Sequence, residues 1–173
     1  SVLLETEFLR TLDQANICSG YAEMLKDGLI SNQRHFNELL SFDMNRIDYV
    51  LLKGLVGESV KVKEEIVAND PHEHGIRKAL NLGHTVGHAF ESLALAEGRP
   101  VLHGYAVAWG LVCELYLSYI YTGFPKELLQ QVIYFVRNNY GAYRFDCKQY
   151  EQHYERMKHD KKNSNGIINF TLL

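Results

Sequence analysis

The chain has few of the residues that interrupt helices or cross-link loops. Its 173 residues include only three prolines and three cysteines. Cys18, Cys113 and Cys147 are too few and too widely spaced for a disulfide framework or a cysteine-rich zinc knuckle, so cysteine usage favours a reducing cytoplasm. Few prolines also leave long stretches of the chain able to form helices.

Long apolar runs and an excess of one charge are also missing. No apolar run approaches the ~18 residues of a membrane span, and no basic segment followed by an apolar core marks a signal peptide. The net charge is −3 and basic residues are scattered, apart from a short stretch at 158–162. We therefore expect a soluble, cytoplasmic protein with neither nucleic acid nor membrane as a partner.

What the sequence does contain is a helical repeat of apolar residues. At 46% hydrophobic content the chain can bury one core, and residues 1–173 are expected to form a single, mainly α domain. Segment 69–75, NDPHEHG, gives the strongest loop signal, and only 167–173, IINFTLL, resembles a strand. Helices are expected over 21–29 after Ser19 or Gly20, 31–40 with Ser31 as N-cap, 47–66 as one or two helices, 76–96, 103–121, 125–138 and 148–158.

Polar residues gather in the segment expected to form the helix over 76–96. On one continuous helix Arg77, Asn81, His84 and His88 fall within an arc of about 60°. A buried row of this kind needs an anionic or metallic partner, or hydrogen bonds to nearby carbonyls if its role is structural. Thr85 follows His84 where the metalloprotease motif has Glu, which excludes that class of peptidase.

Further metal ligands are available on both sides of this segment. His103 lies at the expected start of a helix, and Glu23 and Lys26 lie one helical turn apart. Taken alone, Glu23 and Lys26 are most simply a surface ion pair. One carboxylate and two imidazoles form a common open catalytic site for a divalent cation, but spacing does not decide which three residues converge.

Four blocks of the sequence together resemble 3-dehydroquinate synthase. They are SGYAEMLKDGLI, VKEEIVANDPHEHGIRKALNLGHTVGHAFESL, LHGYAVAWGL and MKHDKKNSNGIINFTLL, in the family's order and over most of the chain. The resemblance covers the family's C-terminal helical domain. The family's N-terminal α/β domain, which binds NAD, is not part of this sequence, and no G-x-G-x-x-G motif follows a strand.

The resemblance implies a set of site residues. Zinc, or cobalt, would be held by Glu23, His84 and His103, with His88 beside the metal as a substrate-binding or proton-handling group. Positions that contact the substrate in the family are occupied by Lys26, Lys63, Arg77, Asn81 and a lysine of the pair Lys161 and Lys162. Glu73 matches an acidic position near the site. Several fixed cations suit an anionic, phosphorylated sugar acid.

The implied reaction converts 3-deoxy-D-arabino-heptulosonate 7-phosphate to 3-dehydroquinate and phosphate, a step of the shikimate pathway. It uses NAD and zinc, and the family's enzymes form homodimers. Without the nucleotide-binding domain these 173 residues are expected to be inactive alone. Tyr105 departs from the family, which usually has Glu after L-H-G, so substrate preference or local packing is open at that position.

Several alternatives remain. Another sugar-phosphate cyclase would share the fold and metal. Glycerol dehydrogenase-like enzymes do not need the phosphate-reading cations, and a metal-dependent phosphohydrolase would need an adjacent His-Asp pair, for which only His159-Asp160 is available. In a non-catalytic helical interaction module the polar row would be structural. Metal uptake lost on His84→Ala would distinguish the catalytic domain from the module.

Overall fold

The structure is a computed structural model that describes residues 4–144, 146–158 and 167–173. Its helices in chain order are η1 (Glu7–Thr11), α1 (Gln14–Ser31), α2 (Gln33–Leu40), α3 (Tyr49–Asn69), η2 (Ile76–Asn81), α4 (His84–Ala96), α5 (His103–Tyr121), α6 (Lys126–Tyr140), η3 (Cys147–Gln149) and α7 (Tyr150–Lys158). The mainly α class expected from the sequence is confirmed. No helix in these ranges has both the length and the apolar character that a membrane crossing requires.

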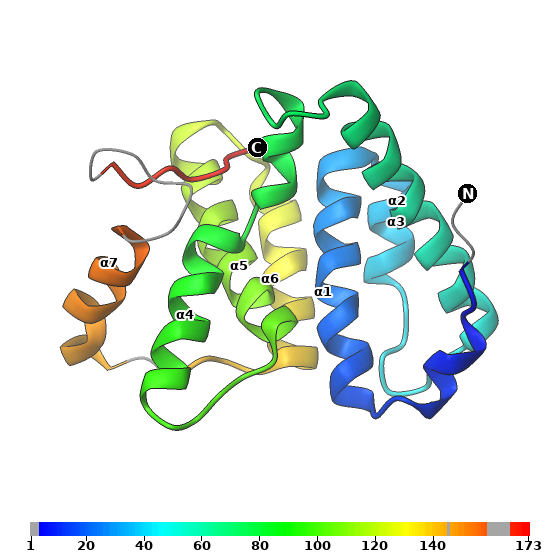
Figure 1. The fold of residues 1–173 in the computed structure, drawn as a ribbon, viewed down its shortest axis with the longest axis horizontal. Helices are drawn as coiled ribbons and strands as arrows, with labels where there is room; N and C mark the ends of the chain where they lie inside the picture. The colour runs from blue at the N-terminus through cyan, green and yellow to red at the C-terminus, as the bar shows by residue number, and fades with distance from the viewer. Residues whose placement is uncertain (1–3, 145, 159–166) are drawn as a thin grey trace.

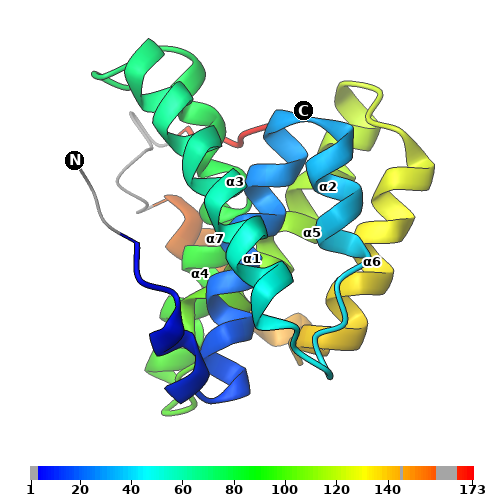
Figure 2. The same cartoon turned by 90° about the vertical axis from the view of Figure 1, so that its right-hand side faces the viewer.

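Helix α1 stands at the centre of the bundle. It contacts α2 and α3 on one side and α5 on the other, while α7 lies beyond α4 (Figure 1). Seen from the side, α3 lies in front of α1, with α2 and α6 beside it (Figure 2). Aromatic and aliphatic side chains of α1, α2, α5 and α6 form the main core, whose fully buried members include Tyr21, Leu25, Leu39 and Leu111.

Side-chain caps determine where the first three α-helices begin. Asp13 accepts a hydrogen bond from the backbone N–H of Asn16, so α1 begins well before the predicted start at Ser19 or Gly20. Asn32, and not Ser31 as predicted, caps α2. The stretch after Asp48 forms one helix, α3, because neither of its glycines interrupts the backbone.

The predicted helix over 76–96 is wrong, because the segment is two helices. Residues Ile76–Asn81 form the 3₁₀ helix η2, the chain turns at Leu82 and Gly83, and α4 begins at His84. Gly83 has a φ of 79°, a conformation that side chains other than glycine rarely adopt. Arg77 and Asn81 therefore do not share a helix face with His84 and His88.

The predicted C-terminal strand is also wrong. Residues 167–173 contain one bridge residue, Ile167, and otherwise run as irregular chain across the start of α4 towards α5 (Figure 1). Among the described residues, side-chain hydrogen bonds hold this segment. Thr85 donates to the carbonyl of Asn169, and the N–H of Leu173 donates to the hydroxyl of Ser118.

Candidate metal centre

Glu23 projects from the middle of α1 and is paired with Lys26. The Lys26 ammonium donates to Glu23 Oε2 at 2.7 Å and to the carbonyl of Leu80 at 2.8 Å. Lys26 is only 2% exposed, so this is not the surface ion pair that the spacing alone suggested. With one oxygen of Glu23 held by a buried ammonium, Oε1 is left to face the neighbouring helices.

His84 is placed by a buried carboxylate from α5. Glu114 accepts hydrogen bonds from the backbone N–H groups of Gly83 at 2.8 Å and Val86 at 3.2 Å. These N–H groups belong to the first turn of α4, where the helix dipole favours a negative charge. The carboxylate thus ties the start of α4 to α5 and fixes where His84 emerges.

His103 is placed by a close approach between α5 and α1. A Cβ on Gly104 would lie 1.8 Å from the carbonyl oxygen of Ser19, and the Gly104 N–H donates to the Ser19 hydroxyl at 3.0 Å. A Cβ on Gly110, further along α5, would lie 2.0 Å from the Gly83 carbonyl oxygen. Glycine at these positions lets the three helices meet and brings His103 to Glu23.

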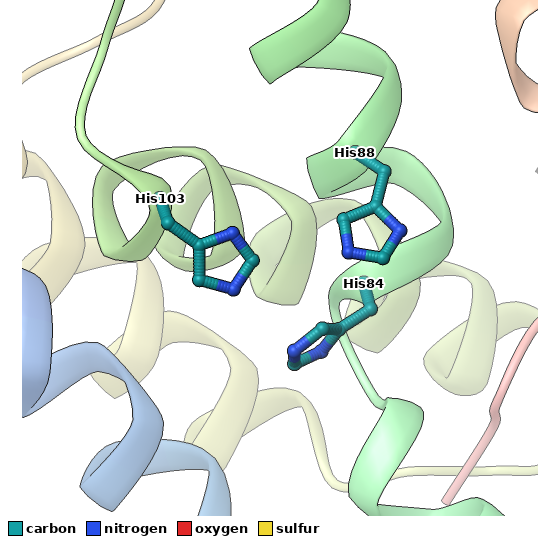
Figure 3. Close-up of side chains that lie close together, drawn as sticks. All are labelled: His84, His88 and His103. Carbon is teal, nitrogen blue, oxygen red and sulfur yellow. The ribbon is translucent and has the colours of Figure 1, made fainter.

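Three imidazoles and one carboxylate converge at this junction. Glu23 Oε1 lies 3.1 Å from Nε2 of His84 and 3.5 Å from Nε2 of His103. Figure 3 shows the rings of His84, His88 and His103 gathered between the start of α5 and the first turns of α4, and one ligand atom from each lies within 4.8 Å of the others. The ring centroids are 5.4 to 5.8 Å apart.

Each of the two imidazoles that face Glu23 has its other ring nitrogen engaged. Nδ1 of His84 lies 3.1 Å from the carbonyl oxygen of Leu82, and Nδ1 of His103 lies 3.1 Å from Glu91 Oε2. A carbonyl or carboxylate on Nδ1 favours the tautomer with a free Nε2 lone pair, which is the arrangement seen around histidine-bound metals.

The two imidazoles and Lys26 hold Glu23 in its charged form. Burial acts to raise the pKa of Glu23, but hydrogen bonds from His103 and His84 and the charge of Lys26 hold it well below its usual range. The hydrogen bond with Glu23 raises the pKa of His103 to about 9, against the opposing effect of burial and with further support from Glu91. Glu23 is thus an anion, and a cation that bound here would replace the His103 proton.

This donor set fits a divalent metal. One carboxylate oxygen and two Nε2 atoms, with engaged Nδ1 atoms behind them, match zinc's preference for nitrogen and oxygen ligands and leave a position for another group. His88 is close enough to compete as a ligand, so geometry alone leaves two sets of three: Glu23 with His84 and His103, or the three histidines.

The other predicted site residues differ in whether they contact this junction. Lys63 on α3 reaches it, with Nζ 3.8 Å from Glu23 Oε2. Asn81 donates to Glu73 at 2.8 Å, and the Arg77 guanidinium donates to the carbonyl of Pro71 at 2.8 Å. A cleft of about 930 Å³ is lined by Glu73, Asn81 and residues 169–172 of the C-terminal segment. Lys161 and Lys162 lie outside the described residues.

Four contributors to the site were missed by sequence reasoning. Glu91 lies one helical turn after His88, and that spacing could have indicated it. Asp27 directly follows Lys26 in the first resemblance block, but no motif marks it. Glu114 and the carbonyl of Leu80 reach the site only through tertiary contacts and carry no local signal. Tyr105, where the family usually has Glu, packs against the rings of Trp109 and Tyr140.

Comparison with known proteins shows the family of this chain. The family described as 3-dehydroquinate synthase C-terminal matches residues 20–163, a range that contains Glu23, His84, His88 and His103. The chain belongs to this family. A protein named 3-dehydroquinate synthase from Parabacteroides distasonis is 58% identical over 172 residues, which are 99% of this chain and 49% of that protein.

More distant family members give the same picture. Proteins of that name from Oceanobacillus iheyensis and Leptospira interrogans are 38% and 37% identical over 100% and 95% of the chain. The matches cover 48% and 45% of those two proteins. The chain therefore spans about half the length of the curated relatives it matches.

Proposed function

We propose that this chain is the metal- and substrate-binding part of a 3-dehydroquinate synthase, a lyase that forms 3-dehydroquinate and phosphate from 3-deoxy-D-arabino-heptulosonate 7-phosphate. The observation that carries the proposal is the approach of Glu23 Oε1 to the Nε2 atoms of His84 and His103, in a chain of this family. NAD would be held mainly by a domain that these 173 residues do not contain.

Glu23, His84 and His103 would hold zinc or cobalt. When bound, such an ion lowers the pKa of a substrate hydroxyl and stabilises negative charge on its oxygen. Lys26 supports this set by holding Glu23 Oε2 and thereby directing Oε1 to the histidines. Glu91 would orient His103 through Nδ1 in the same way.

The remaining residues would bind and orient the anionic substrate. The side chain of Lys63 is 42% exposed at the rim of the site and can meet a carboxylate or phosphate there. Asn81 and Glu73 line the cleft beside residues 169–172, and His88 lies beside the proposed metal ligands, where it can donate or accept a proton. Arg77 would have to exchange its contact with the Pro71 carbonyl for one with the substrate.

Metal uptake is the first test. The chain is dialysed against zinc and its metal content measured, for the unchanged sequence and for Glu23→Gln, His84→Ala and His103→Ala. Each substitution is expected to weaken binding by about 3 kcal/mol, or roughly a hundredfold, as one ligand's share of a typical zinc affinity. His72→Ala, an exposed histidine in the loop after α3, is the matched control and should bind normally.

Failure of the unchanged chain to take up metal would favour the non-catalytic helical module. A His88→Ala variant separates the two possible ligand sets. If Glu23, His84 and His103 are the ligands, His88→Ala keeps the metal, whereas Glu23→Gln keeps it if the three histidines are the ligands.

Turnover is the second test. The chain is joined to the upstream half of the Parabacteroides distasonis relative, and phosphate release from the heptulosonate phosphate is assayed with NAD and zinc. The chimera is expected to be active and the 173 residues alone inactive. An active metal-binding chimera that accepts a different sugar phosphate in preference would identify another sugar-phosphate cyclase.

A further inference from the structure

Asp27 is a buried carboxylate that the roles described so far do not use. It lies one helical turn after Glu23 on α1 and is 0% exposed. Neither of its oxygens has a hydrogen-bond partner within the part of the chain that the structure describes. Burying a carboxylate without hydrogen bonds costs free energy, so packing alone gives no reason for an acidic residue at this position.

The charged partner of Asp27 is Lys63, which reaches across from α3. Its Nζ lies 3.6 Å from Asp27 Oδ2 and 3.8 Å from Glu23 Oε2. All three side chains line one cavity of about 260 Å³ between α1 and α3. Lys63 is thus held between two carboxylates while its side chain stays partly exposed to solvent.

The two lysines beside Glu23 differ in how firmly they are held. Lys26 is buried and has short hydrogen bonds to Glu23 and to the Leu80 carbonyl. Both contacts of Lys63 exceed 3.5 Å. Lys26 is therefore committed to orienting Glu23, whereas Lys63 can move by a small distance to meet a ligand.

A bound divalent cation would change the balance around Lys63. The cation takes up the charge of Glu23 and repels an ammonium group a few ångströms away. Asp27 then supplies the negative charge that keeps Lys63 at the rim of the site. Without a cation at Glu23, the carboxylate of Glu23 could itself hold Lys63, and Asp27 would not be needed for this.

We propose that Asp27 is a positioning residue that holds Lys63 at the edge of the Glu23 site, ready to bind an anionic group of the substrate. This inference rests on the proposed function. It predicts that Asp27 does not stabilise the fold, because replacing an unsatisfied buried carboxylate with its neutral isostere removes a cost of folding. Asp27→Asn is therefore expected to keep or raise the melting temperature.

The test uses the active chimera with Asp27→Asn, Lys63→Met and both together. Lys63→Met is expected to raise KM for the heptulosonate phosphate about tenfold, the worth of one charge-assisted hydrogen bond, and Asp27→Asn about threefold to tenfold. In both variants kcat should change less than about threefold. The double variant should resemble Lys63→Met, because Asp27 acts through Lys63. Lys61→Met, on the same helix and paired only with Glu58 among the described residues, is the matched control.

The opposite results are distinct. If Asp27 merely adds negative charge, Asp27→Asn lowers KM, since the anionic substrate then meets a more positive site. If Asp27 is structural, the melting temperature falls and the effects of the two substitutions add. Either result overturns the inference while leaving the proposed function intact. A chimera of unchanged sequence that binds zinc but releases no phosphate contradicts the proposed function itself.

Discussion

The first turn and the middle of α4 contact histidines in opposite environments. At its start, His84 lies with Glu23 and His103 among carboxylates and lysines. In its middle, Phe90 packs against His153 of α7, with ring centroids 4.4 Å apart. The pKa of His103 is raised to about 9 by its carboxylate partners, and burial lowers the pKa of His153 to about 4 with help from the charge of Arg156.

This contrast shows that the neighbours of a histidine, and not the residue type, decide what it can do. Burial, together with the nearby charge of Arg156, keeps His153 neutral, and its ring packs against Phe90. His103 has two carboxylates within 3.5 Å, and they favour its protonated form. Both surroundings are assembled by contacts between helices that are distant in the sequence.

The largest expected effect comes from forcing α5 away from α1, because these two helices carry His103 and Glu23. Gly104→Ala places a methyl group 1.8 Å from the Ser19 carbonyl oxygen, so α5 must move away from α1. We expect a loss of at least about 3 kcal/mol in the free energy of unfolding, measured by urea denaturation, with loss of zinc binding in whatever remains folded.

Gly20→Ala is the control for this substitution. Gly20 lies within α1 and has open space where a Cβ would be placed, so alanine should raise stability by up to about 1 kcal/mol. Equal stability of the two alanine variants would mean that the close approach of α5 to α1 is not tight in solution.

The substitution His153→Leu removes the buried imidazole that packs against Phe90. Because the folded-state pKa of His153 is lowered, the unfolded chain takes up the proton first as the pH falls. The stability from neutral His153 is fully present above about pH 6.5 and is lost as the pH falls to about 4, with a span of about 3 kcal/mol.

In the leucine variant this pH-dependent loss should disappear. The measurement is the difference in unfolding free energy between the two proteins, at several pH values between 7 and 4 and in the presence of chelator. A constant difference across this range would contradict the buried, neutral state of His153. Zinc uptake at pH 7.5 should be the same in both proteins.

The smallest effect is expected at the boundary between the two environments. Glu91 directly follows Phe90 on α4, and it contacts His103 Nδ1. Glu91→Gln keeps the size of the side chain but weakens its hold on the imidazole, so zinc affinity should fall about tenfold. Chelator competition measures this, and an unchanged affinity would show that Glu91 does not orient His103.

Much of the fold could be read from local sequence signals. The helix His103–Tyr121 has the predicted bounds, the loop after Asn69 lies where NDPHEHG indicated it, and the mainly α class follows from the apolar period. Errors occurred where tertiary contacts replace local ones. Glu114 supplies partners to the N–H groups at the start of α4, so the backbone can turn at Gly83 and the helical pattern does not continue from Ile76.

Local sequence signals also predicted part of the candidate site. The sequence blocks named Glu23, His84 and His103 as ligands, and the structure brings these three together, while their role stays a prediction. The expected row on one helix face was wrong. Lys26 was expected to be exposed on spacing alone, yet it is buried, because the carbonyl of Leu80 comes from a segment 54 residues away.

By itself the sequence determined the helical class, the family and the residue types that a cation and an anionic substrate require. These follow from periodicity and from motifs within short segments. Only the tertiary structure decided that Glu23 faces two Nε2 atoms, that Asp27 lies close to Lys63 and that His153 is buried. The meeting of Glu23 with the two histidines depends on how closely the helices pack at Gly104 and Gly110, and a local pattern does not reveal which backbone will meet a glycine.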